Sequence, residues 1–144
     1  MDIIDALDQK LIALLRKNSR QSSDVLGVQL GVDSSTVRRR IKRLVNQGVL
    51  GFYAHPNPAA IGFPVKAIIG LDVAPQKMRV VIDTLRSREE IRWIYPTSGR
   101  YDIMVMGWFA SNQAIYDFVE SVIGKLEGAR NTETFICLGR ADET

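Results

Sequence analysis

The densest cluster of charge in this sequence lies between residues 38 and 43, where five of the six residues are Arg or Lys. Three residues with hydroxyl side chains precede it: Ser34, Ser35 and Thr36. Cationic side chains neutralise phosphates, and an arginine can donate two parallel hydrogen bonds to the edge of a guanine. These residue types, so closely spaced, predict a surface that contacts nucleic acid.

A helix is the element expected to present these side chains, because apolar residues recur at helical spacing through the same stretch. A helix from Ser34 to Gly48 places four apolar residues on one side: Val37, Ile41, Leu44 and Val45. The other side then carries Ser35, Arg39, Lys42, Arg43 and Asn46. Arg38 and Arg40 fall on the flanks, where Arg40 either faces a ligand or pairs with an acid of a preceding helix.

Two shorter helices are predicted before this cationic helix. The first runs from about Ala6 to Lys17, with Asp5 and Asp8 spaced as a capping box and Asn18 as a left-handed stop. The second starts after Ser22 or Ser23 and buries Val25, Leu26 and Leu30.

Gly31 ends the second helix with a positive φ, and Gly27 permits a close approach between helices. Asp33 is placed to cap the third helix. A helix, a glycine turn and a cationic helix form a helix-turn-helix, whose second helix lies in the major groove of DNA. The predicted DNA contacts are Ser34, Ser35, Thr36, Arg38, Arg39, Lys42 and Arg43.

Different DNA contacts are expected along this helix. Arg39 is the best candidate for a guanine, whereas Lys42 and Arg43 are expected to bind phosphates. Ser34 to Thr36 offer hydroxyls and helix N-terminal amides to a phosphate.

The whole composition fits this interpretation and excludes several others. The 144 residues are 46% hydrophobic and 24% charged, as in an ordinary globular protein. Residues 1–50 hold nine Lys and Arg against five Asp, whereas residues 51–144 hold ten against eleven acids. Only the first third is therefore expected to meet a polyanion.

The sequence also argues against several other classes of protein. Cys137 is the only cysteine and His55 the only histidine, which excludes an internal disulfide and a zinc site of the usual kind. We expect no metal, no cofactor, no membrane span and no signal peptide, and a cytoplasmic location.

A break in pattern follows the cationic helix. Val49 to His55 is predicted to be a short strand, either a wing or a strand that pairs in a dimer. Prolines and glycines then indicate a linker: Pro56, Pro58, Gly62 and Pro64. The expected divisions are residues 1–50 for DNA binding, 51–64 for the strand and linker, and 65–144 for a second domain.

The second domain alternates between strand and helix patterns. Its predicted elements are strands Val65–Val73, Ile91–Ser98, Tyr101–Phe109 and Ala129–Gly139, with helices Pro75–Arg88 and Asn112–Glu127. The order βαββαβ predicts a ferredoxin-like fold, in which both helices cover one face of an antiparallel sheet. The fold class is thus α+β, with an N-terminal winged-helix-like helix-turn-helix domain.

The uncovered face of that sheet is predicted to be apolar. Ile68, Met104, Met106 and Trp108 point away from the helix-covered face. An apolar patch of a few hundred Å² is rarely left in water, so we expect a second subunit to cover it. Trp93, Tyr95 and Trp108 are accordingly interpreted as core or interface residues, and Cys137 as a small buried hydrophobe.

Both halves of the chain resemble the Lrp/AsnC family of transcription regulators. In the first half the matching residues are Leu7-Asp8, Asn18-Ser19-Arg20, Gly31-Val32, Ser34 to Val37, Arg40 to Leu44, Gly48-Val49, and Asn57-Pro58 with Gly62. In the second half, Ser98-Gly99-Arg100-Tyr101-Asp102-Ile103 resembles the family's Gly-x-(aromatic)-Asp signature. The similarity extends from about Asp5 to Leu138.

This resemblance implies a homodimer that assembles further, typically to octamers, and a C-terminal effector domain of the RAM or ACT type. It also implies an amino acid or similar small metabolite as effector, bound near the signature loop. The implied effector-binding residues are Thr97, Ser98, Gly99, Arg100, Tyr101, Asp102, Thr132 and Thr134. An ammonium group needs an anion such as Asp102, and a carboxylate needs donors such as the amides of Ser98 to Arg100. Without the resemblance, the same loop is a plain hairpin turn.

The predicted function is therefore a non-enzymatic DNA-binding regulator whose DNA affinity or assembly responds to a metabolite. One alternative is an architectural DNA-binding protein without an effector. A less favoured alternative is an enzyme similar to the sirohaem decarboxylases, which share this layout but would require histidines, of which only His55 is present. The effector, the operator and the direction of regulation are not encoded in any visible motif.

Overall fold

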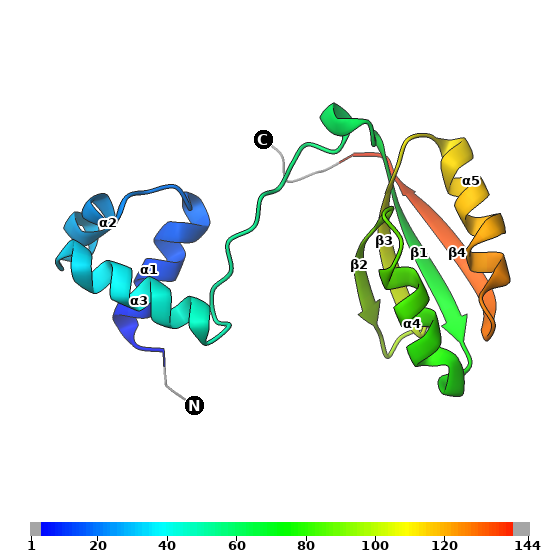
Figure 1. Cartoon of the computed structure of the whole chain (residues 1–144), viewed down its shortest axis with the longest axis horizontal. Helices are drawn as coiled ribbons and strands as arrows, with labels where there is room; N and C mark the ends of the chain where they lie inside the picture. Colours follow the sequence, from blue (N-terminus) through cyan, green and yellow to red (C-terminus); the bar gives the residue numbers. More distant parts are fainter. Residues whose placement is uncertain (1–3, 140–144) are drawn as a thin grey trace. The chain divides into compact units, whose positions relative to one another are not determined.

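The computed structural model describes residues 4–139 of the chain. They form two compact units that divide between His55 and Pro56 (Figure 1). The division falls inside the linker segment expected at residues 51–64.

The first unit contains three helices. They are α1 (Ala6–Lys17), α2 (Ser23–Leu30) and α3 (Ser34–Asn46). The predicted capping box of α1 is present, since the Asp5 carboxylate accepts the Asp8 N–H while the Asp8 side chain accepts the Asp5 N–H. Ser22 rather than Ser23 caps α2. Gly31 ends α2 at a φ of 69°, as the turn requires.

The prediction of a left-handed stop at Asn18 is wrong. Asn18 is extended, at φ −152° and ψ 102°. Its N–H donates to the carbonyl of Leu14 over 3.1 Å, and its side chain accepts the N–H of Arg20 over 3.0 Å. The asparagine therefore ends α1 through its side chain, not through a left-handed backbone.

A small apolar cluster holds the three helices together. Its buried members are Leu11, Leu15, Leu26, Val37 and Leu44. Val25 and Val45 were expected to be buried, but they are 48% and 41% exposed. In the eight-residue helix α2 only Leu26 and Gly27 are buried, so the buried stripe is narrower than periodicity alone predicts.

Gly27 lies at a close approach of two segments of backbone. A Cβ at this position would lie 2.6 Å from the carbonyl oxygen of Val32. A close approach is present as expected, but the turn that leads into α3 makes it and not a second helix.

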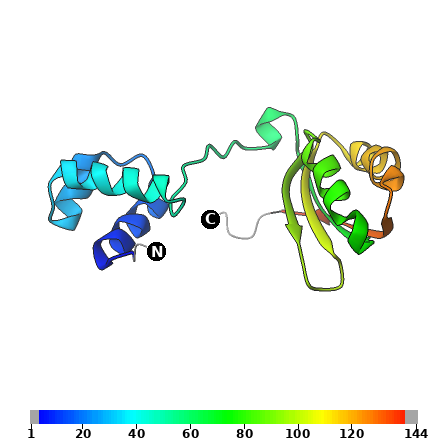
Figure 2. The same cartoon turned by 60° about the horizontal axis from the view of Figure 1, so that its bottom comes forward.

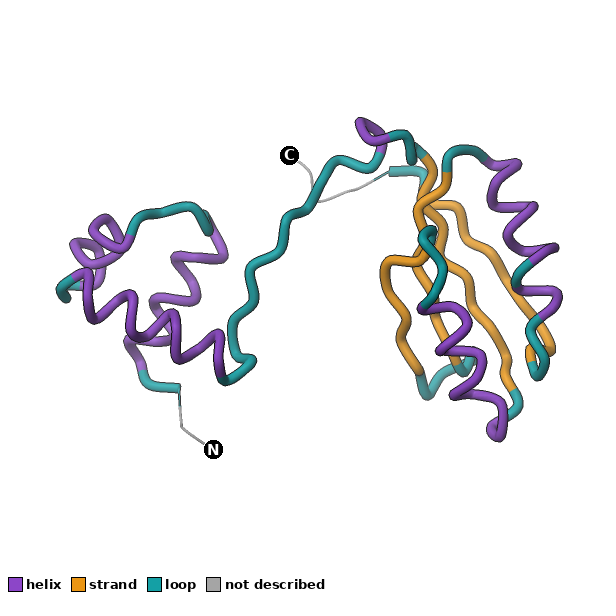
Figure 3. Tube along the Cα trace, viewed as in Figure 1, coloured by secondary structure: helices purple, strands orange, loops and turns teal. Residues whose placement is uncertain are grey.

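The predicted strand from Val49 to His55 is wrong for the single chain. After α3 the backbone of residues 51–57 has no regular structure (Figure 3). Within the described residues no neighbouring strand pairs with it, so no wing is formed. A short 3-10 turn, η1 (Ala59–Ile61), precedes the second unit.

The second unit is the predicted α+β sheet domain. Its strands are β1 (Val65–Val73), β2 (Ile91–Pro96), β3 (Ile103–Phe109) and β4 (Ala129–Cys137). Its helices are α4 (Met78–Arg86), after the 3-10 turn η2 (Pro75–Lys77), and α5 (Asn112–Ser121), before the 3-10 turn η3 (Ile123–Lys125). Both helices of this unit are thus shorter than expected, because the first turn of one predicted helix and the last turn of the other are 3-10 turns.

The strands are ordered β2-β3-β1-β4, and every neighbouring pair is antiparallel. Both helices lie on one face of the sheet (Figure 2). The core on that face includes Ile69, Leu71, Val81, Val105 and Phe118. The ferredoxin-like arrangement is therefore confirmed.

Candidate nucleic-acid interface and ligand site

The start of α3 is fixed by an aspartate cap. One Asp33 oxygen accepts the N–H of Thr36 over 2.8 Å, and the hydroxyls of Ser35 and Thr36 also donate to this carboxylate. The hydroxyl of Ser35, followed by the amide and hydroxyl of Thr36, holds the pKa of Asp33 well below its usual 3.8. The hydroxyls of Ser35 and Thr36, which were expected to bind a phosphate, therefore already donate to Asp33.

Three cations of α3 remain available to a ligand. Arg38, Arg39 and Lys42 are exposed, and the structure gives them no ion pair with any residue between 4 and 139. The opposite side of the helix is anchored through Val37 and Leu44, which are 1% and 0% exposed. The apolar and cationic faces follow the expected helical spacing at Val37, Leu44, Arg39 and Lys42, but Val45 is exposed.

The other two arginines of α3 pair with α1. Arg40 Nη1 lies 2.6 Å from Asp5 Oδ2 and 2.9 Å from Asp8 Oδ1, while Arg43 Nη2 contacts Asp8 Oδ2. Of the alternatives for Arg40, the structure therefore favours the internal ion pair. The hydrogen bond from Arg40 is the largest cause that lowers the pKa of Asp5, and this acid in turn raises the pKa of Arg40.

The ion pair of Arg43 has no counterpart in the sequence-based prediction, which assigned this residue to a phosphate. The Arg43 side chain is 41% exposed, while that of Asp8 is completely buried. The contact of Arg43 with a phosphate stays a prediction. Part of its guanidinium already pairs with Asp8.

In the second unit, main-chain hydrogen bonds hold the loop between β2 and β3. Thr97 N–H donates to the carbonyl of Asp102 over 2.9 Å, and Asp102 N–H donates to that of Leu71 over 3.0 Å. The Thr97 hydroxyl also donates to the carbonyl of Tyr101. Ser98 and Gly99 are exposed at the tip.

The Asp102 carboxylate also supports β1. Its Oδ2 accepts the N–H of Val73 over 2.8 Å, where the pairing of β1 with β4 shifts register. Asp102 thus joins the loop to an irregular strand end. This is a structural contact that the sequence did not reveal.

Tyr101, Arg100 and Glu133 come together on the sheet face that the helices leave uncovered. The Tyr101 ring lies over Gly70, where a Cβ would be 2.5 Å from a ring carbon. The Arg100 guanidinium is 5.3 Å from the centre of that ring, and its Nη2 is 3.9 Å from Glu133 Oε2. Glu133 was not predicted, because only the pairing of Gly70 with Glu133 brings it here.

The structure does not bring Thr132 and Thr134 to this cluster. They pair with Leu71 and Ile69, two core residues on the helix-covered face. Residues opposite each other in an antiparallel pair share a face, so both threonines lie on the other side of β4 from Glu133.

The uncovered sheet face carries large apolar side chains, as predicted. Trp93, Tyr95 and Phe135 are 52%, 56% and 44% exposed, and the rings of Trp93 and Tyr95 stack with centroids 6.5 Å apart. The Arg92 guanidinium lies 4.6 Å from the ring centre of Trp108. Cys137, which was expected to be buried, is only half-buried.

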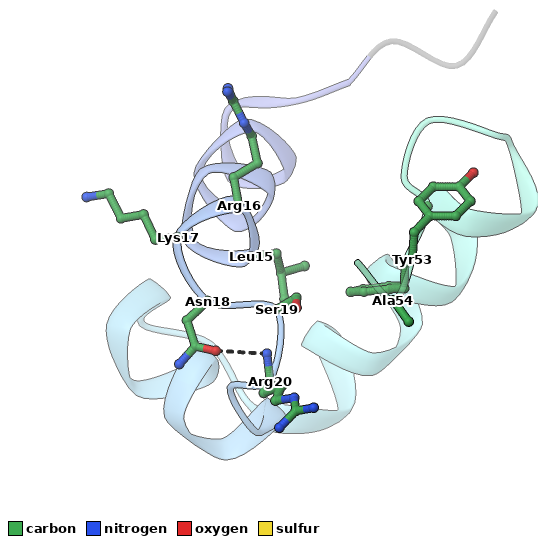
Figure 4. A pocket seen from close by; sticks show the side chains of 10 residues that line it. Leu15, Arg16, Lys17, Asn18, Ser19, Arg20, Tyr53 and Ala54 are labelled. Atoms are coloured by element: carbon green, nitrogen blue, oxygen red, sulfur yellow. Dashed lines mark hydrogen bonds between the residues drawn. The ribbon is translucent and has the colours of Figure 1, made fainter. Parts of the chain in front are cut away.

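A cavity of about 690 Å³ lies in the first unit, between the end of α1 and residues 51–54. Arg16 and Lys17 line it, yet Figure 4 shows their side chains pointing away from Tyr53 and Ala54. A small-ligand site requires convergent polar groups, and these two cations do not converge on the cavity.

Two negative findings hold for residues 4–139. No three His, Cys, Asp or Glu side chains are grouped so that they hold a metal ion. No helix in this range is long and apolar enough to cross a membrane.

A helix-turn-helix with exposed cations, followed by a ferredoxin-like domain, defines a two-domain DNA-binding regulator. Residues 4–45 match the AsnC-type helix-turn-helix domain, and residues 66–144 match the Lrp/AsnC ligand binding domain. The chain belongs to the Lrp/AsnC family of transcriptional regulators. It is therefore not an enzyme, which removes the decarboxylase alternative.

Individual relatives agree with this assignment. The HTH-type transcriptional regulator Ptr1 of Methanocaldococcus jannaschii is 32% identical over 94% of this chain and 93% of its own length. The structure of AsnC from E. coli superposes with a TM-score of 0.86 at 26% identity, covering 96% of this chain and 95% of that one. A regulator from Neisseria meningitidis, NMB0573, solved as a complex with L-Met, has the same fold, with a TM-score of 0.90 at 20% identity over 99% and 94% of the two chains.

Proposed function

We propose that α3 lies in the major groove of DNA and recognises its operator mainly through Arg39. The observation that carries this proposal is the exposed set of Arg38, Arg39 and Lys42, which form no ion pair with residues 4–139 and lie opposite the buried face of α3. Arg39 lies at the centre of the exposed face and donates to a guanine, while Lys42 and Arg38 bind phosphates. Ser34, Ser35, Thr36 and Arg43 form the edge of the contact.

Two matched substitutions test this assignment. Arg39→Ala removes a base contact, so affinity for the operator falls by the equivalent of ~1–3 kcal/mol while affinity for a scrambled duplex changes little. Lys42→Ala removes a phosphate contact, so both affinities fall alike and the salt dependence flattens. Fluorescence titrations with both duplexes measure these effects. Equal behaviour of the two variants would contradict the assignment.

We further propose that an amino acid or similar zwitterionic metabolite binds at the 97–102 loop. Arg100 and the amides of Ser98 and Gly99 are donors for its carboxylate, and Glu133 with the second oxygen of Asp102 are acceptors for its ammonium. Arg100 and Glu133 lie side by side, with Nη2 3.9 Å from Oε2, and these adjacent opposite charges support a ligand that itself carries both charges. The L-Met bound to the Neisseria regulator supports the ligand class.

A thermal-shift screen of the twenty amino acids identifies the effector. A ligand at a hundred times its Kd stabilises the native protein by ~2.7 kcal/mol. Arg100→Ala and Asp102→Ala are expected to abolish that shift and the effector's influence on DNA affinity, while DNA binding without effector persists. If no metabolite changes DNA affinity or particle mass, the architectural alternative is correct instead.

A second copy of the chain is the proposed partner of the uncovered sheet face, with dimers assembling further, for example to octamers. The exposed aromatic side chains of Trp93, Tyr95 and Phe135 support this interface. Trp93→Glu is expected to convert the dimer to monomers in light scattering. Tyr116→Glu is the control, since Tyr116 is 61% exposed on α5 of the opposite layer.

A further inference from the structure

We infer that Asp8 of α1 is a positioning residue for DNA recognition, which fixes how α3 presents Arg39 to the major groove. The inference rests on the proposed role of α3. Asp8 lies outside the helix-turn-helix of α2 and α3, and no DNA contact is assigned to it. It acts through Arg40 and Arg43.

The Asp8 carboxylate accepts hydrogen bonds from three groups. It is 0% exposed. Its Oδ1 accepts Arg40 Nη1 at 2.9 Å, while its Oδ2 accepts Arg43 Nη2 and, at 3.2 Å, the N–H of Asp5. A buried carboxylate without partners is costly, so these contacts oppose any displacement of α3 from α1.

The two arginines anchor α3 at points almost one turn apart. Arg39 is adjacent to the first anchor and lies one turn before the second, on the face it shares with Arg43. Rotation of α3 about its axis, or sliding along α1, would break at least one pair. The apolar contacts of Val37 and Leu44 resist separation but are not directional, so the ion pairs set the direction in which Arg39 points.

Arg43 also leaves one donor unsatisfied. Its Nε is buried and has no hydrogen-bond partner among the described residues. An unsatisfied buried donor opposes stability, and an apolar side chain here would avoid that cost. A role in orienting α3 therefore explains the Asp8–Arg43 pair better than a contribution to folding stability alone, because the carboxylate fixes the position of this guanidinium.

The substitution Asp8→Asn tests whether Asp8 orients α3 or only contributes its negative charge. Asp24→Asn is the matched control. Asp24 is an exposed acid of α2 that makes no ion pair with the described residues. Each substitution removes one negative charge, which by itself raises affinity for any DNA. The positioning role predicts instead that Asp8→Asn lowers the ratio of operator to scrambled affinity about tenfold, the scale of one base contact.

The probes are a duplex enriched by the wild-type protein from a random pool and a scrambled duplex of equal composition. The ratio of the two affinities is insensitive to partial unfolding, because a smaller folded fraction weakens both equally. If Asp8→Asn changes the ratio no more than Asp24→Asn, the inference is wrong.

Asp8→Glu is the second variant, since it retains the charge and moves the carboxylate by one methylene group. A fall in the ratio supports positioning, and an unchanged ratio overturns it. Arg39→Ala in the same assay separates the two proposals. If Arg39→Ala lowers the ratio and neither Asp8 variant does, only the positioning role fails, whereas no effect from any variant refutes both.

Discussion

In the first unit, side-chain carboxylates hold the candidate binding surface, whereas in the second unit most of the contacts that hold it are main-chain hydrogen bonds. Asp33 caps α3 and Asp8 pairs with its arginines. The 97–102 loop is fixed through the backbone of Thr97, Asp102 and Leu71, and the Asp102 carboxylate adds one contact with the N–H of Val73.

This difference follows from the elements that carry the two surfaces. A helix satisfies its interior backbone groups by itself, so only its ends and its side chains can be tied to neighbours. A loop beside a sheet has backbone donors and acceptors to share. Substitutions that change a charge should therefore disturb the surface of the first unit more. Substitutions that alter the backbone or the packing should disturb the surface of the second unit more.

The largest expected effect tests whether the two units are independent. Leu44→Ala, in the small cluster of the first unit, is expected to destabilise that unit by ~2–5 kcal/mol. Both tryptophans, Trp93 and Trp108, lie in the second unit. Urea unfolding followed by circular dichroism should shift, while unfolding followed by tryptophan fluorescence should not.

Ile103→Ala is the matched control in the second unit, where Ile103 is equally buried. It should shift the fluorescence transition. A common shift of both signals by Leu44→Ala would show instead that the two units unfold together.

A smaller effect contrasts two glycines that lie against different neighbours. Gly27→Ala places a methyl group against the carbonyl of Val32 and is expected to cost ~1–3 kcal/mol. The nearest atoms to the new methyl group of Gly70→Ala belong to the side chain of Tyr101, which can move away. This substitution should cost less in stability but displace Tyr101, as NMR shifts of that ring would show. A larger loss of stability for Gly70→Ala would contradict this comparison.

The smallest effect concerns acid. The pKa of Asp33 and that of Asp5 are lowered in the folded protein from the usual 3.8. The unfolded chain therefore takes up these protons first, so their stabilisation is complete above about pH 3.8 and is lost as the pH falls further. Asp33→Asn retains a capping side chain and should flatten this dependence in urea unfolding measured at decreasing pH. An unchanged slope would exclude Asp33 as a source of acid sensitivity.

How far the sequence could predict each surface depended on the range of the interactions involved. The cap at Asp33, the turn at Gly31 and the two faces of α3 depend on residues within a few positions of one another, and all three were predicted. The left-handed Asn18 was not found, because a side-chain hydrogen bond to Arg20 offered another way to end α1. The strand expected from Val49 to His55 was not found either, because a strand requires a neighbour that local pattern cannot supply.

The sequence by itself determined the two-domain order, the helix-turn-helix and the βαββαβ succession, because periodicity, caps and glycine turns are local properties of the chain. Only the tertiary structure decided which charges meet. Asp8 is separated from Arg40 and Arg43 by more than thirty residues, and Glu133 reaches Arg100 only through the pairing of β1 with β4. Contacts of that kind depend on the packing of whole elements, in which one residue of register moves a side chain to the opposite face.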